Sequence, residues 1–206
     1  MGKIELNKMQ KNTTLLQTAF DLFTEKGFAK TTISDIVNQA GLAKGTFYLY
    51  FKDKYDLRDK LVVHKTGQLF LNAHNALARH PVEGFENQLL FVLDHIIHAL
   101  EKNHGLLQFI SKNLSWGVFK NAFEKKVNSE SQQFFDYYVG LLEKNHILCE
   151  KPEILLFTII ELVGSTCYSC ILYKEPVSMA EYMPYLHQAI HQILTTFTKS
   201  AEETIR

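Results

Sequence analysis

Apolar side chains recur with helical spacing along nearly the whole chain. The first stripe falls at i, i+3, i+4 and i+7 and consists of Leu16, Ala19, Phe20 and Phe23. A second, shorter stripe with the same spacing consists of Ile33, Ile36, Val37 and Ala40. Gly27 follows the first stripe and Gly41 the second, and glycine is a common helix stop. Each stripe therefore predicts a helix with one face turned to a core.

The rest of the chain continues this pattern. A short helix is predicted from Ala43 to Phe51, and a longer one starts near Lys54 and fades before Pro81. Longer helices are then predicted at residues 83–102, 105–114, 116–146, 153–174 and 178–199. No stretch alternates apolar and polar residues between turn residues, as a half-buried strand would. We therefore expect an all-α fold of about nine helices.

Composition limits the classes of protein that fit this pattern. The 206 residues carry 22 basic and 22 acidic side chains, so a histone-like polycation and an acidic disordered tail are both excluded. Three cysteines, an odd number in a chain with ample core, do not indicate a disulfide framework. Residues 1–14 include three lysines and lack the apolar segment of a signal peptide. We expect a soluble cytoplasmic protein with no membrane partner.

The zero net charge hides two opposite halves. Residues 1–65 hold 11 Lys/Arg and 7 Asp/Glu, a balance of +4. Residues 66–206 hold the other 11 basic and 15 acidic side chains, a balance of −4. The two halves therefore face different partners, and only the first suits a polyanion.

The segment from Thr31 to Leu57 carries the most specific chemistry. Two short helices joined by a Gly-containing turn form a helix-turn-helix, whose second helix enters the DNA major groove. At 100° per residue, Phe47 and Phe51 share the core-facing side of that second helix. Its opposite side presents Gly45, Thr46, Leu49 and Tyr50.

Each exposed residue type has a use on DNA. Gly45 lets the backbone approach the bases, and Thr46 can hydrogen-bond and touch a thymine methyl group. Lys44 can reach a guanine edge or a phosphate. The remaining candidates for phosphate or backbone contact are Thr32, Tyr48, Tyr50, Lys52 and Lys54. A tight helical hairpin with solvated lysines would show the same generic pattern.

A larger set of residues is family-specific in order and spacing. It consists of Thr32, Ile33, Ile36, Ala40, Gly41, Gly45, Phe47, Tyr48, Phe51, Lys54 and Leu57, preceded by Phe23, Gly27 and Phe28. This set, within about residues 8–60, resembles the N-terminal signature of the TetR family. The resemblance implies a homodimeric bacterial transcription regulator with a helix-turn-helix DNA-binding domain at residues 1–58 and a helical effector-binding and dimerisation domain at residues 59–206. It implies a repressor that a small apolar or aromatic effector releases from a palindromic operator on the nucleoid.

Carried over by position, the resemblance places Lys44, Gly45, Thr46, Tyr48 and Tyr50, with the neighbouring Ala43 and Leu49, on the recognition helix. Thr32 and Lys54 become phosphate anchors. The chain departs from the family pattern at two positions: Ala43 stands where a serine is common, and Tyr50 where a histidine is frequent. The operator sequence cannot be transferred across these changes.

Two C-terminal helices suggest the dimer interface. Residues 153–174 are apolar around most of the helix, with small residues in the middle, and such a helix must be buried. By resemblance, this helix and the last one pair with their copies across a two-fold axis. The candidate interface residues are Gly164, Ser165, Leu186, Ile190, Ile193 and Phe197. The alternative is that both helices only complete the core of one subunit.

The aromatic residues of the C-terminal part could line an effector pocket with a few polar groups among them. The candidates are Phe91, His95, Phe109, Trp116, Phe119, Tyr137, Thr166 and Tyr168. Aromatic residues at helical spacing are more often core than ligand contacts.

Metal, redox and catalytic roles are disfavoured. His187 and His191 stand at i, i+4, but no further ligands can be assigned to complete a set of four. Cys167 and Cys170 lie one turn apart in an apolar helix, where packing is the usual role. We find no phosphate-binding loop, zinc-protease motif or nucleophile elbow, so we expect neither an enzyme nor a cofactor. The remaining alternative is a helical carrier of apolar molecules without a DNA function.

Overall fold

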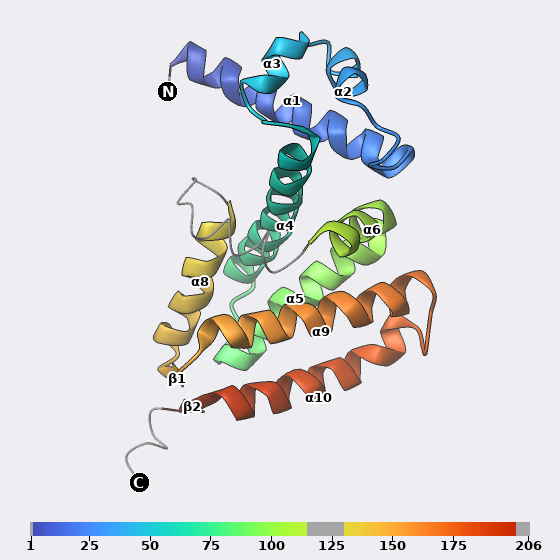
Figure 1. The fold of residues 1–206 in the computed structure, drawn as a ribbon. Coiled ribbons are helices and arrows are strands. Elements are labelled where there is room, and N and C mark those ends of the chain that lie inside the picture. The colour runs from blue at the N-terminus through green and yellow to red at the C-terminus, as the bar shows by residue number, and fades with distance from the viewer. Residues whose placement is uncertain (1, 115–129, 201–206) are drawn as a thin grey trace.

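The computed structural model describes residues 2–114 and 130–200, and it is all-α apart from one short strand pair (Figure 1). The helices are α1 (Lys3–Glu25), α2 (Ile33–Gln39), α3 (Lys44–Tyr48), α4 (Lys54–Arg79), α5 (Phe85–Lys102), α6 (His104–Asn113), α8 (Glu130–Lys144), α9 (Pro152–Leu172) and α10 (Met179–Phe197). The predicted all-α class is confirmed. Of the helix predicted at 116–146, the part before residue 130 lies outside the described residues.

Helices α1 to α3 gather at one end of the molecule (Figure 1), which we call the head. Gly27 and Gly41, which end the first two helices, have φ angles of +86° and +67°, which glycine adopts without strain. Thr32 begins α2 with a capping box: its side chain accepts from the Asp35 N–H, and the Asp35 carboxylate accepts from the Thr32 N–H. Local sequence therefore fixes both the short helices and the turns between them.

The helix α4 connects the head to the rest of the molecule, the body, without a break. The predicted domain boundary between residues 58 and 59 falls inside this helix, and Leu57 and Leu61 on either side of it are fully buried. Buried side chains form one continuous cluster from α1 to α10. The two predicted domains therefore share one core instead of being joined by a linker.

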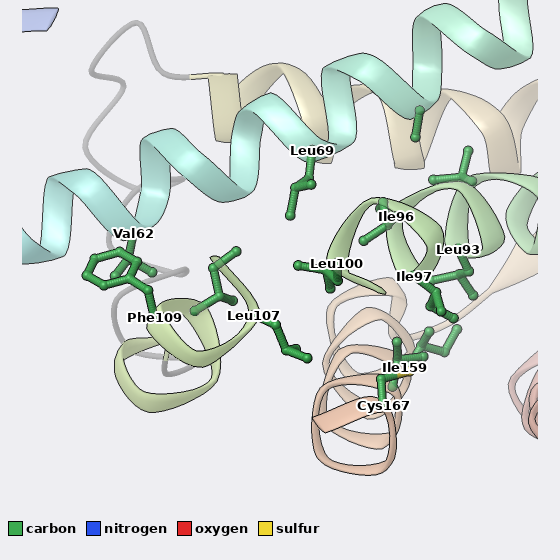
Figure 2. Close-up of a cluster of buried hydrophobic side chains, with 14 of the residues drawn as sticks. Val62, Leu69, Leu93, Ile96, Ile97, Leu100, Leu107, Phe109, Ile159 and Cys167 are labelled. Atoms are coloured by element: carbon green, nitrogen blue, oxygen red, sulfur yellow. The ribbon is translucent and has the colours of Figure 1, made fainter. Parts of the chain in front are cut away.

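The core of the body is formed where α4, α5, α6 and α9 converge. Figure 2 shows Leu69 of α4, Leu93 and Ile97 of α5, Leu107 of α6 and Ile159 of α9 in this cluster, all of them buried. α9 is long and apolar enough to cross a membrane by length and composition, but its buried face packs against α6 and α10. A core helix of a soluble protein satisfies the same criterion.

No strand is expected from the sequence, and the structure corrects this with one short strand pair. Strand β1 (Ile147–Cys149) pairs antiparallel with β2 (Thr198–Ser200), in the register Ile147↔Ser200 and Cys149↔Thr198. Three residues are too few to show a two-residue alternation in sequence. The pair ties the end of α10 to the connection between α8 and α9.

Candidate nucleic-acid interface and effector cavity

One side of α3 packs on the head core, and the other side carries exposed residues. Phe47 and Phe51 are buried, with ring centroids 5.4 Å apart, and hold the helix on the head core. On the other side, the side chain of Tyr48 is 53% exposed and that of Leu49 79% exposed. Ala43, Lys44 and Gly45 are exposed beside them.

The fold does not require a glycine at position 45. A Cβ atom built on Gly45 meets no atom within 4 Å, and the residue does not have a positive φ angle. Glycine in a helix costs stability relative to alanine. A glycine that no internal contact needs is suited to a surface that another backbone or base approaches closely.

Thr32 is exposed at the start of α2, where we predicted a phosphate contact. Its hydroxyl oxygen accepts from the Asp35 N–H, which leaves the hydroxyl hydrogen free to donate. The Asp35 carboxylate binds the Thr32 N–H and lies 3.0 Å from Lys26 Nζ. These partners, the backbone N–H first and then the Lys26 ammonium, lower the pKa of Asp35 to about 2.

Lys54 is placed differently from our prediction. Its ammonium donates to the carbonyl oxygens of Phe28 and Thr31, both at 2.8 Å, and lies 4.3 Å from the centroid of the Phe28 ring. The side chain therefore fastens the start of α4 to the turn between α1 and α2. This corrects the expected role of Lys54 as a free phosphate anchor, because a polar turn needs an internal donor there.

Three other residues predicted to contact DNA differ from one another in exposure. Lys52 is exposed, and its ammonium forms no hydrogen bond or ion pair within the described residues, although its charge is close enough to Asp56 to interact with that carboxylate. Tyr50 is half-buried, with its ring 6.3 Å from that of Phe51, and its carbonyl oxygen accepts from Lys60 Nζ. Thr46 is also half-buried. The exposed surface around α3 is thus centred on Lys44, Gly45, Tyr48, Leu49 and Lys52.

A cavity of about 110 Å³ lies between α4, α5, α6, α8 and α9. Its accessible wall is entirely carbon, contributed mainly by leucine, isoleucine and valine side chains. Thr66 of α4 also lines it, and its hydroxyl is buried without a hydrogen-bond partner among the described residues. Burying an unpaired hydroxyl costs free energy, so this site is a weak point of the ligand-free protein.

The predicted pocket residues agree with this cavity at one position. Tyr137 lines it, with its ring 4.2 Å from that of His74, and burial raises the pKa of the Tyr137 hydroxyl. The other predicted residues that the structure describes do not line it: Phe91, His95, Phe109, Thr166 and Tyr168. Trp116 and Phe119 lie outside the described residues. The walls that the prediction missed come from ordinary apolar stripes on α4 and α5, which look like core in a sequence.

Phe109 has a different place, between body and head. Its ring lies 5.6 Å from that of Phe20, edge to face, and 6.3 Å from that of Phe23, stacked. The next residue, Ile110, lines the cavity. α6 therefore contacts the cavity with one side chain and the head with its neighbour. Lys65 of α4 adds a polar link, since its Nζ donates to Gln17 Oε1 at 2.9 Å.

The predicted dimer residues divide into two groups. Leu186 and Ile190 are fully buried within one subunit, because they face inward from α10. Ile193 and Phe197 are half-buried and pack against the same core, whereas Gly164 and Ser165 are exposed on α9. The exposed face of α9 also carries Ile154 and Phe157, which the prediction did not include.

The paired histidines and cysteines have internal roles. His187 Nε2 lies 2.7 Å from Asp94 Oδ1, and His191 Nδ1 lies 3.0 Å from Glu86 Oε1, so each histidine joins α10 to α5. Within residues 2–114 and 130–200, no three His, Cys, Asp or Glu side chains gather as a metal site. Burial, then the neighbouring Cys170, raises the pKa of Cys167 to about 12, which keeps it a thiol.

Comparison with known proteins assigns the N-terminal motif and relates most of the chain to known regulators. Residues 15–61 match the family model "Bacterial regulatory proteins, tetR family". The chain is 44% identical over 161 residues to the HTH-type transcriptional regulator YvdT of Bacillus subtilis, which covers 74% of this chain and 78% of the relative. It is 39% identical over 135 residues to the Fatty acid metabolism regulator protein of the same organism, covering 66% of this chain and 68% of the relative.

Solved structures share the fold at lower identity. The fatty acid degradation regulator FadR of Bacillus halodurans matches with a TM-score of 0.59 and 19% identity, covering 87% of this chain and 94% of that one. A TetR-family regulator from Syntrophomonas wolfei matches with a TM-score of 0.65 and 16% identity, covering 91% and 96%. The arrangement of a small helical head on a helical body is therefore shared beyond recognisable sequence similarity.

Proposed function

The chain belongs to the TetR family of helix-turn-helix transcription regulators, and from this premise we propose that it is a homodimeric repressor that a small apolar effector releases from a palindromic operator. As a member of this family it is a DNA-binding regulator and not an enzyme. The observation that carries the proposal is the outer side of α3, where Gly45, Tyr48 and Leu49 are exposed in the part of the chain that the structure describes.

We assign base contacts to the exposed side of α3. Lys44 and Tyr48 can reach base edges or phosphates, Gly45 allows close approach, and Leu49 offers an apolar surface to a thymine methyl group. Thr32 and Lys52 contact phosphates on either side of the groove. In this assignment Lys54 acts indirectly, by holding the start of α4 on the turn that precedes α2.

The proposed dimer uses the exposed face of α9. Ile154 and Phe157 are large apolar residues on this face, and Gly164 and Ser165 continue it with small side chains that permit close helix contact. The face also carries the exposed Glu161 between these residues, so its carboxylate needs a partner within the contact. A two-fold axis beside α9 and α10 pairs this face with its own copy.

The proposed effector is uncharged where it contacts the cavity. An ionised group would lose its hydration against an all-carbon wall, whereas a hydrocarbon gains by burial. The relative named as a fatty acid metabolism regulator supports a hydrocarbon portion in the effector of this chain too. We expect the protein in the bacterial cytoplasm, where its operator is.

Release from DNA follows because α4 and α6 both line the cavity and contact the head. An effector that expands the cavity displaces α4 through Thr66 and Leu69 and α6 through Ile110. Both helices also contact α1, so the head moves with them. Two recognition helices must stand about 34 Å apart, one turn of DNA, and a misfit of a few ångströms weakens binding.

The test is binding to DNA selected from random sequence by the wild-type protein, measured at two salt concentrations. We expect affinity to fall with salt, and Tyr48→Ala and Lys52→Ala to weaken binding without changing the melting temperature. Lys102→Ala, in the body, is the control for a lost charge. Binding that does not depend on salt, or that is unaffected by Tyr48→Ala, contradicts the proposal and leaves the carrier function.

A further inference from the structure

The first three turns of α1 extend beyond the head core as an exposed helix. No residue from position 2 to position 11 is buried, whereas Leu15, Leu16 and Ala19 further along the same helix are all buried. Figure 1 shows these turns running out past α3, at the end of the molecule opposite α9 and α10. We call residues 3–11 the N-terminal arm.

One stripe of side chains along α1 changes from apolar and buried to basic and exposed where the helix leaves the core. At 100° per residue, Leu15, Ala19 and Leu22 fall within a narrow arc, and all three are buried against the head and body. The same arc continues toward the N-terminus through Lys11, Lys8 and Ile4, all exposed. The apolar stripe therefore becomes basic, and Lys8 and Lys11 point to the side on which the rest of the head lies.

The two lysines are free to bind a partner. Neither ammonium has an ion pair or hydrogen bond within the described residues, unlike Lys26 of the head and Lys54, Lys60 and Lys65 of α4. Lys3 adds a third positive charge to the arm, and Glu5 is its only acidic residue and binds the Gly2 N–H. A partner of this face must be negatively charged.

We propose that the N-terminal arm is a second DNA contact, in which Lys8 and Lys11 bind backbone phosphates outside the base pairs that α3 reads. This contact rests on the proposed DNA-binding function and adds a site to it. Lys3 lies about 18 Å along the helix axis from Leu15, where the core begins, since a helix rises about 1.5 Å per residue, and each DNA strand carries a phosphate about every 3.4 Å along the duplex axis. Two neighbouring lysines one turn apart match two phosphates.

The contact supplies affinity and no sequence information. Lysine binds phosphate as a point charge, so the arm strengthens binding to any sequence that flanks the site. It also makes binding more dependent on salt, because each neutralised phosphate releases a counterion. The footprint of the protein on DNA is then longer than the groove segment that α3 occupies.

The experiment compares wild-type protein with a Lys8→Gln/Lys11→Gln variant on two duplexes of one sequence, obtained by selection with the wild type. The long duplex extends ten base pairs beyond the footprint on each side, and the short duplex ends at the last base pair that the variant protects from hydroxyl radicals. Lys102→Gln/Lys151→Gln removes the same charge from exposed positions of the body and is the control.

We expect the arm variant to bind the long duplex more weakly, with a slope of log K against log salt that is shallower by about 1.8 per head, about 0.9 for each lost contact. On the short duplex, variant and wild type should bind alike. An unchanged slope on the long duplex, or an equal loss on both, overturns the proposal; the second result would point to a contact between the two heads. If the wild type itself shows no salt-dependent binding, the proposed function fails before the arm is tested.

Discussion

At the residue scale, a substitution at Gly45 should affect the stability of the fold and the affinity for DNA in opposite directions. Alanine fits without a clash and favours the helix, so Gly45→Ala should raise the free energy of unfolding by about 0.5–1 kcal/mol. The added methyl group stands where a base or backbone must approach, so affinity for DNA should fall. Denaturant unfolding and a gel-shift titration measure the two effects, and a variant that loses both stability and affinity would show that Gly45 serves the fold.

Two neighbouring lysines offer a matched comparison. Lys54→Met removes two charge-assisted, partly buried hydrogen bonds to turn carbonyls and should cost about 1.5–3 kcal/mol of stability. Lys52→Met removes an exposed ammonium and should leave stability within about 0.5 kcal/mol while weakening DNA binding. Thermal unfolding of the two variants tests this assignment, which a reversed order would refute.

In the cavity, the buried hydroxyl of Thr66 offers a third test at the scale of one residue. Thr66→Val keeps the shape of the side chain and removes the unpaired hydroxyl, so it should stabilise the ligand-free protein by about 1 kcal/mol. Calorimetry measures the change. A loss of stability would mean that the hydroxyl has a partner, for instance an ordered water.

At the element scale, the cap of α2 makes the stability of the head depend on pH. The pKa of Asp35 is lowered to about 2 in the fold from an ordinary value of 3.8, so its contribution is complete above about pH 4 and is lost as pH falls toward 2. Asp35→Asn should therefore lower the melting temperature at pH 7 and approach the wild type in acid. A difference between the two proteins that stays constant from pH 7 to pH 2.5 would contradict this charge-based account.

Elements differ in how far sequence predicts them. Helices with a stripe, a cap and a glycine stop were predicted within a few residues, because their signals are local. The strands β1 and β2 and the internal role of Lys54 depend on segments that meet only in the fold: residue 147 pairs with residue 200, and Lys54 with Phe28. The cavity walls were missed for the same reason, since leucines around a void have the same pattern as leucines around a core.

At the scale of the whole molecule, the proposed dimer depends on the exposed face of α9. Ile154 is 49% exposed at its start, and Ile154→Glu should place a charge in the proposed interface and shift the protein toward monomers. Leu71→Glu, on an exposed position of α4 with 42% exposure, should leave the dimer intact. Light scattering at several protein concentrations distinguishes the two, and a monomeric wild type would refute the interface.

The aromatic contact at Phe109 limits which bodies of other family members can be joined to this head. The Phe109 ring, which is part of the body, packs against the rings of Phe20 and Phe23 of the head. We call the surface formed by these two rings the socket. A chimera that joins this head to the body of another family member leaves the socket empty unless that body carries a matching aromatic residue. Whole heads can therefore be exchanged between family members only where this pair of complementary surfaces is kept.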